Sequence, residues 1–259
     1  MNIYKSLNKY QEIAHFCTTR NGGVSVGNYA SFNLNPFTGD DEESVIKNQN
    51  ILCQQIGIST DRLFIPHQTH GTEIKEISPA FLDLSHDGKN EYLNGVDGIF
   101  TQLPHVCIGI TTADCVPLLF FDPIKKVIAA VHAGWRGTCQ HIAAKTINTL
   151  AQRFDSNPQN IIVSIGPSIS AKVYQVGEDV VESFDKAGFE NSTIFENRKD
   201  GIFLDLWKAA EQDLLRSGVL KENIEITGIC TFSEHEKFFS ARKLGIKSGR
   251  MLSGIMLKE

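Results

Sequence analysis

Three short apolar runs lie close together in the middle of the chain, at residues 106–110, 116–121 and 127–131. Each has the length of a β-strand, and turn-forming or charged residues (Asp122-Pro123, Lys125 and Lys126) separate the last two. Continuous apolar runs of this length are typical of buried strands, and they are too short to span a membrane. The centre of the chain therefore predicts a buried sheet.

Strands and helices are expected to alternate along the rest of the chain. Acidic residues open the helix expected at 41–56, and Gly57 is placed to end it. Further helices are expected at 138–154, 177–187 and 204–217, and further strands at 13–18, 72–77, 161–165, 224–229 and 251–257. The polar stretches 83–94 and 191–200 are interpreted as surface loops. This mixed order predicts an α/β or α+β fold, with one layered domain over residues 1–259 and mixed sheets covered by helices.

Composition excludes several classes of protein. The net charge of -5 gives no general reason to bind nucleic acid or an anionic membrane, so neither is expected as a partner. Residues 1–16 contain no apolar signal region, which predicts a cytoplasmic protein. The 6 cysteines include no CxxC pair, so reduced thiols are expected. Most of these cysteines, Cys17, Cys107 and Cys230 among them, are interpreted as buried core residues.

The segment HQTHG (67–71) carries two histidines. Pro66 before it and Gly71 at its end favour an extended conformation, in which side chains three residues apart point to opposite faces. One histidine is therefore a candidate ligand and the other structural. His70, which leads into the next strand, is the better candidate.

Two other polar segments follow buried strands. TTADCVP (111–117) places Cys115 beside Asp114, which by itself would raise the pKa of the thiol, whereas a nearby cation or metal ion reverses that effect. VHAGWRG (131–137) places His132 at a strand end, before a helix N-terminus that favours anions, and Arg136 adds positive charge there.

Two histidines and one cysteine match the three protein ligands of a catalytic zinc site whose fourth position is open. His70, Cys115 and His132 are therefore the predicted metal ligands and catalytic residues. The 8 histidines and 6 cysteines allow many other triples, and the spacing alone does not bring these three together. Asp114 could serve as an acid/base group or could orient a ligand histidine. Cys139 and His141, inside the expected helix, are interpreted as structural.

Several motifs together resemble one known family. They are TTRNGGVSVGNYASFNL (18–34), HQTHG (67–71), VDGIFT (96–101), TTADCVPLLFFDP (111–123), VIAAVHAGWRGT (127–138), IGPSIS (165–170), YQVGEDV (174–180) and FFSARKLGIKSGRMLSGIML (238–257). In this order they resemble the YfiH family, also called the laccase-domain or multi-copper polyphenol oxidase family, whose members are now largely named purine nucleoside phosphorylases. The resemblance implies a fold of the YfiH and CNF-toxin-like type, and it assigns the zinc ligands to His70, Cys115 and His132.

The resemblance also implies an activity. It is the phosphorolysis of adenosine and inosine, with methylthioadenosine as a related substrate and adenosine deamination as a further reaction. Purine nucleoside and inorganic phosphate are the expected partners of a monomer or weak homodimer, and zinc is the expected cofactor, with copper as the alternative. The candidate phosphate-binding residues are Arg20 beside a glycine-rich loop, Arg136 and Arg242, since guanidinium groups bind phosphate in bidentate geometry. One departure is visible, because Ser240-Ala241-Arg242-Lys243 stands where the family often has FFSYRR.

Other functions use the same residues. A hydrolase acting on a peptidoglycan precursor could use Cys115 as nucleophile and His70 or His132 as base. A copper-dependent polyphenol oxidase is a second alternative, although scattered histidines and only 3 methionines make a multi-copper cluster hard to build. A binding protein without enzymatic activity is the third.

Overall fold

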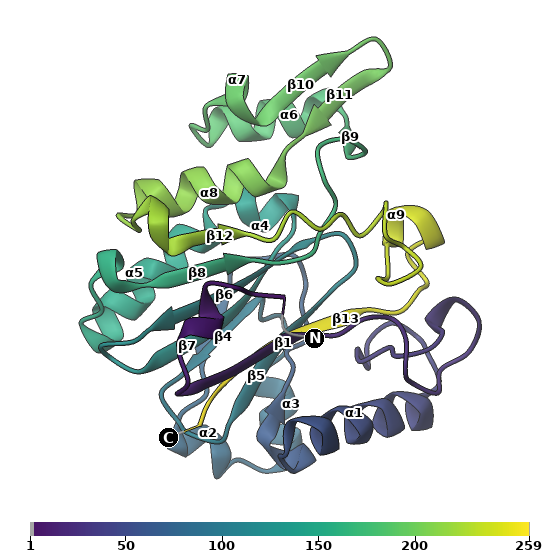
Figure 1. Cartoon of the computed structure of the whole chain (residues 1–259), viewed down its shortest axis with the longest axis vertical. Helices are drawn as coiled ribbons and strands as arrows, with labels where there is room; N and C mark the ends of the chain where they lie inside the picture. The colour runs from purple at the N-terminus through teal and green to yellow at the C-terminus, as the bar shows by residue number, and fades with distance from the viewer. Residues whose placement is uncertain (1–2, 259) are drawn as a thin grey trace.

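The computed structural model describes residues 3–258, and within them two sheets lie one on the other (Figure 1). The six-stranded sheet has the order β12-β8-β6-β7-β4-β3, and the four-stranded sheet has the order β1-β13-β5-β2. Their strands are β12 (Ile224–Ile226), β8 (Ile162–Ile165), β6 (Val116–Asp122), β7 (Val127–Ala133), β4 (Gly98–Thr101) and β3 (Ile74–Glu76), and β1 (Ile13–Cys17), β13 (Met251–Leu257), β5 (Cys107–Thr112) and β2 (Leu63–Phe64).

Most strand pairs are antiparallel, but β12 with β8, β3 with β4, and β2 with β5 are parallel. A third, small sheet joins β10 (Phe195–Arg198), β11 (Gly201–Leu204) and β9 (Gln175–Val176). The helices are α1 (Glu42–Ile56), α2 (Pro79–Leu82), α3 (His86–Tyr92), α4 (Trp135–Cys139), α5 (Ile142–Phe154), α6 (Glu178–Lys186), α7 (Asn191–Ile194), α8 (Leu206–Arg216) and α9 (Ala241–Leu244). The mixed α/β architecture expected from the sequence is confirmed.

Strand β6 explains why its sequence is continuously apolar. Leu118 and Phe120 pack into the core between the six-stranded sheet and helices α5 and α8, whereas Leu119 and Phe121 pack into the core between the two sheets. Both faces of the strand are therefore buried, and every residue of β5, β6 and β7 is buried. A third core, which includes Leu52 of α1, covers the outer face of the four-stranded sheet. The layers run helix, sheet, sheet, helix.

Helix α1 begins and ends as its sequence predicts. The side chain of Asp41 accepts a hydrogen bond from the backbone N–H of Ser44, which caps the first turn. Gly57 follows the last turn in the left-handed conformation, with a φ of 73°.

The helix predicted at 138–154 is two helices. Helix α4 begins earlier, at Trp135, and ends at Cys139; His141 then takes a left-handed conformation with a φ of 60°, and α5 begins at Ile142. The break is stabilised by tertiary contacts, since Nδ1 of His141 lies 2.7 Å from a carboxylate oxygen of Asp213 and Nε2 lies 3.0 Å from the carbonyl oxygen of Ala187.

Two further expectations about local structure are wrong. The polar stretch 83–94 contains α3, whose N-cap is Ser85, and the stretch 191–200 contains α7 and β10. Both segments are half-exposed, and their polar sequences hide the regular structure that turns and strand pairing impose on them. Among the helices of residues 3–258, none has the length and apolar character needed to cross a bilayer.

Candidate metal centre and cavity

Three segments that are distant in sequence bring His70, Cys115 and His132 together. His70 lies in the loop between β2 and β3, Cys115 follows the turn between β5 and β6, and His132 is the penultimate residue of β7. Their ligand atoms all lie within 4.8 Å of one another. The two imidazole rings meet edge to face, with 4.8 Å between centroids. His132 is buried, Cys115 is half-buried and His70 is exposed, so the group opens to solvent on one side.

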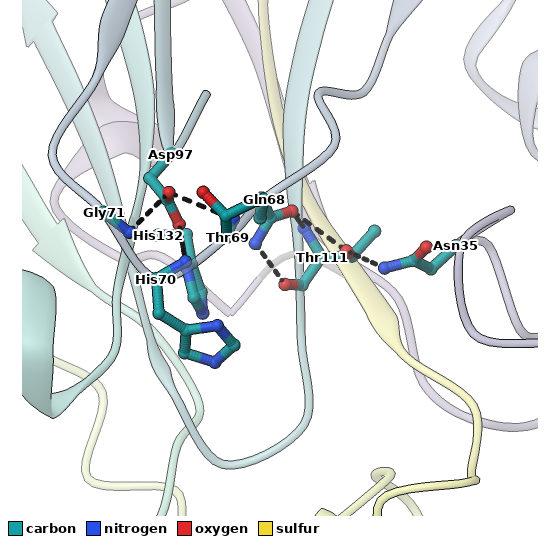
Figure 2. Close-up of polar contacts among 8 residues, drawn as sticks. All are labelled: Asn35, Gln68, Thr69, His70, Gly71, Asp97, Thr111 and His132. Carbon is teal, nitrogen blue, oxygen red and sulfur yellow. Dashed lines mark hydrogen bonds and ion pairs between the residues drawn. The ribbon is translucent and has the colours of Figure 1, made fainter. Parts of the chain in front are cut away.

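One buried carboxylate, that of Asp97, connects two of these segments (Figure 2). It accepts a hydrogen bond from Nδ1 of His132 at 2.8 Å and from the backbone N–H groups of Thr69, His70 and Gly71 at 3.1, 3.0 and 2.8 Å. Burial raises the pKa of Asp97, but the bonds to His132 and to these N–H groups outweigh it, and the net pKa is lowered. With its proton on Nδ1, His132 keeps the lone pair of Nε2 for a ligand.

Asp97 also fixes an unusual backbone. His70 adopts the left-handed conformation with a φ of 63°, which is rare for a residue with a Cβ atom. Its N–H is one of the three that donate to Asp97, so the bond that holds the loop also stabilises this conformation. The sequence analysis missed Asp97 as a site residue, although it lies in the VDGIFT motif, directly before a strand.

The electrostatic environment of Cys115 favours the thiolate. Burial raises the pKa of this thiol, but the nearby imidazoles of His132 and His70 outweigh it and lower the pKa to about 6. The neighbouring Asp114 does not orient a ligand histidine, contrary to one expectation. Its two carboxylate oxygens accept hydrogen bonds from the hydroxyl of Thr231 and from the backbone N–H of Arg242, each at 2.7 Å.

The start of α4 lies directly against the ligand group. A Cβ atom at Gly134 would lie 3.0 Å from Cδ2 of His70 and 3.1 Å from Sγ of Cys115. These separations are shorter than nearly all real Cβ contacts, so glycine allows the helix to begin against two of the ligands.

The three ligands lie in the wall of a cavity of about 700 Å³. The volume falls within the range of small-molecule sites. The lining combines aromatic rings, amide and hydroxyl groups, and cations. It includes Asn35, Phe37, Gln68, Thr111, Thr112, Trp135, Tyr174, Ala241, Arg242, Lys247 and Arg250.

Arg242 is the only one of the three predicted phosphate-binding arginines that lines this cavity. The guanidinium of Arg20 instead donates hydrogen bonds to the carbonyl oxygens of Ala30 and His235, and so joins the glycine-rich loop to the segment before α9. Arg136 is exposed, with its guanidinium carbon 4.3 Å from the centroid of the Trp135 ring.

Two further cations belong to the cavity wall. Arg250 donates to the carbonyl oxygens of Ile246, Ser248 and Gly249, and Lys247 is exposed beside it. The sequence analysis did not nominate either residue, although both lie in the matching C-terminal motif. Ala241, at the position where FFSYRR carries tyrosine, is itself part of the lining.

A thiolate and two imidazoles are ligands suited to zinc and also to copper. The chain thus has a layered α/β fold with a three-ligand site that could bind one metal ion in the wall of a cavity. Throughout residues 3–258, no second group of three or more His, Cys, Asp or Glu side chains is arranged to hold a metal.

Comparisons with known proteins agree with this description. The family model described as multi-copper polyphenol oxidoreductase laccase matches residues 14–258, and the chain belongs to this family. It is 44% identical over 256 residues to a purine nucleoside phosphorylase of Bacteroides thetaiotaomicron, covering 98% of this chain and 95% of the relative. It is 37% identical to adenosine deaminase RL5 from an unknown prokaryotic organism, covering 94% of this chain and 93% of the relative.

Solved structures show the same fold. The crystal structure of the hypothetical protein YfiH of Bacillus licheniformis has a TM-score of 0.90 and 30% identity, and the match covers 97% of this chain and 94% of that one. The structure of YlmD from Geobacillus stearothermophilus has a TM-score of 0.89 and 31% identity, covering 96% and 93%. The resemblance to the YfiH family is therefore confirmed.

Proposed function

We propose that this chain is a zinc-dependent purine nucleoside phosphorylase. It would cleave adenosine, inosine and methylthioadenosine with phosphate to a free base and ribose 1-phosphate (5-methylthioribose 1-phosphate from methylthioadenosine), and would deaminate adenosine as a second activity. The observation that carries the proposal is the group His70, Cys115 and His132 in the wall of a cavity of nucleoside size. The names of the relatives, purine nucleoside phosphorylase and adenosine deaminase, support the same substrate class.

The donor set favours zinc over copper. A thiolate and two imidazoles suit the three-ligand catalytic sites of zinc, and the cavity lining contains no methionine, the axial ligand typical of blue-copper sites. The lone ligand group of residues 3–258 also argues against a multi-copper oxidase. A zinc ion held by these residues would supply a Lewis acid in the cavity wall, close to a bound substrate.

Phosphate requires positive charge. Arg242 donates two hydrogen bonds to the carbonyl oxygen of Gln175, at 3.2 and 3.3 Å, which hold its guanidinium in place and leave further N–H groups free. Lys247 and Arg250 add charge to the same wall. We infer that phosphate binds among these three cations, held against the anomeric carbon of the sugar.

The purine requires flat apolar surfaces. Phe37, Trp135 and Tyr174 line the cavity, and their rings could stack on a base or pack against ribose. Their enclosure would also exclude water, so that phosphate rather than water reaches the sugar carbon.

One observation favours a second candidate function. The pKa of Cys115, lowered to about 6 beside two imidazoles, is also what a nucleophilic cysteine requires. A cysteine-dependent hydrolase acting on a peptidoglycan precursor is therefore the alternative, and it would need Cys115 free of metal.

Metal analysis together with nucleoside turnover tests the proposal. Purified protein should contain about one zinc per chain, and it should release hypoxanthine from inosine only when phosphate is present. Cys115→Ser should lose both the metal and the phosphorolysis. Cys139→Ser is the matched control, because Cys139 is a half-buried thiol outside the cavity, bonded to the carbonyl oxygen of Ser183. Full phosphorolysis by metal-free protein would contradict the proposal.

A further inference from the structure

Three side chains in the cavity wall, those of Asn35, Gln68 and Thr111, form one hydrogen-bonded network (Figure 2). Gln68 accepts at Oε1 from the backbone N–H of Thr111 at 2.8 Å and from its hydroxyl at 2.9 Å, and it donates from Nε2 to the Thr111 carbonyl oxygen at 2.8 Å. Asn35 donates from Nδ2 to the Thr111 hydroxyl at 2.7 Å and accepts at Oδ1 from the backbone N–H of Phe37 at 2.7 Å.

These bonds determine which way each amide points. If Gln68 were flipped, its NH₂ group would face the N–H of Thr111 and its oxygen would face the Thr111 carbonyl, so both contacts would become repulsive. If Asn35 were flipped, its NH₂ group would face the N–H of Phe37. The orientation therefore follows from backbone partners, which cannot exchange their roles.

The network leaves donors free and few acceptors. Both lone pairs of the Gln68 oxygen are engaged, and the oxygen of Asn35 is turned to the backbone of Phe37. Each NH₂ group has one protein partner and two hydrogens, so each retains one N–H for a ligand. Asp114, the carboxylate of the lining, has both oxygens occupied.

Thr112 adds a third group to this wall. Its hydroxyl is buried, belongs to the cavity lining and has no partner among the described residues. A buried hydroxyl without a partner is unfavourable, so a ligand that bonds to it would relieve that cost.

We propose that Asn35 and Gln68 form a donor wall that selects 6-oxopurine nucleosides, such as inosine, over 6-aminopurine nucleosides, such as adenosine. This inference rests on the proposed function and goes beyond it by assigning the specificity. The carbonyl oxygen of hypoxanthine accepts the free N–H groups, whereas the amino group of adenine would point its own hydrogens at them. Sites built to hydrogen-bond one polar group reject an analogue that leaves those groups unpaired.

Asn35→Asp is the decisive variant. The new carboxylate can still accept from the N–H of Phe37, and the hydroxyl of Thr111 can turn to donate to it, so the local fold has a route to accommodate the change. The free donor becomes an acceptor. We expect the ratio of kcat/KM for inosine phosphorolysis to that for adenosine to fall by roughly tenfold or more. Asn50→Asp, an exposed change of the same charge on α1, should leave the ratio unchanged.

Binding of the free bases gives a second measurement that does not depend on turnover. Calorimetry on zinc-loaded protein should show tighter binding of hypoxanthine than of adenine, and Gln68→Met should reduce that difference while zinc content and melting temperature report an intact fold. Wild-type protein that turns over neither nucleoside and binds neither base would overturn the proposed function itself. Turnover of both nucleosides with a ratio that Asn35→Asp and Gln68→Met leave unchanged would overturn the donor wall alone.

Discussion

Asp97 carries more of the metal site than any residue other than the ligands. Its carboxylate accepts hydrogen bonds from the ring of His132 and from three successive N–H groups around His70. One buried residue thereby sets both the tautomer of one ligand and the backbone of another. Partners of this kind usually affect metal affinity nearly as strongly as some ligands do.

Asp97→Asn should therefore weaken zinc binding by about 10–100-fold. An amide in this place presents an NH₂ group to donors, so at least one of the four hydrogen bonds becomes repulsive. Competition titration with a chromophoric chelator measures the affinity. Asp122→Asn is the control, because Asp122 is buried at the other end of β6 and accepts from two backbone N–H groups. An equal loss of affinity in both variants would show that Asp97 acts only through general stability.

The thiols of the chain should differ in reactivity. Cys115, with a pKa lowered to about 6, should be alkylated rapidly at pH 7 in metal-free protein and should be protected by zinc. Cys17 should remain unmodified, because burial raises the pKa of its thiol to about 11 and covers it. Peptide mass spectrometry after a short exposure to iodoacetamide identifies the modified residue. Alkylation of Cys115 at the same rate with and without zinc would exclude it as a ligand.

At the scale of elements, the sequence predicted the structure where local patterns decide it. The buried strands β5, β6 and β7 and the capped helix α1 were predicted from apolar runs and end signals. The break at His141 was not, because it depends on Asp213, 72 positions further along the chain. The hairpin β10–β11 was missed because its polar, half-exposed residues have no strand-like alternation.

The start of α4 offers a test at this scale. Gly134→Ala would place a Cβ atom against His70 and Cys115, and the added atom must displace one of them. Overpacking of this kind costs about 1–3 kcal/mol, which corresponds to about a tenfold or larger loss of zinc affinity if the ligands absorb it. Gly188→Ala, where a Cβ atom meets nothing within 4 Å, controls for the change in glycine content. Unaltered zinc affinity in Gly134→Ala would mean that α4 moves instead of the ligands.

For the whole molecule, metal removal should lower stability without unfolding the chain. The ligands lie at the edge of cores that the sheets and helices build without them. Zinc at a thousandfold excess over its dissociation constant stabilises the folded state by about 4 kcal/mol, which is equivalent to roughly 10 °C in melting temperature. Thermal melting with and without a chelator measures the difference, and circular dichroism at 25 °C should be unchanged. Loss of helical signal at 25 °C would mean that the metal is required for folding.

How much of the site was predictable follows from where its contacts come from. His70, Cys115 and His132 were nominated because each stands at a strand end in a polar segment, and the family motifs singled out these three. Asp97, Gln68 and Arg250 were not nominated, since their roles come from bonds to segments far away in the sequence. Arg20 was nominated from its glycine-rich neighbourhood, yet its guanidinium is used inside the fold.

The turn from β5 to β6 crosses from the four-stranded to the six-stranded sheet, and Cys115 lies on it. His132 belongs to the six-stranded sheet, so the ligand set straddles the seam between two layers. Any sliding of one layer over the other would change the distances between the ligands. A spectroscopically visible ion bound here would therefore act as a strain gauge for the interior, and its spectrum would record repacking by core substitutions many residues away.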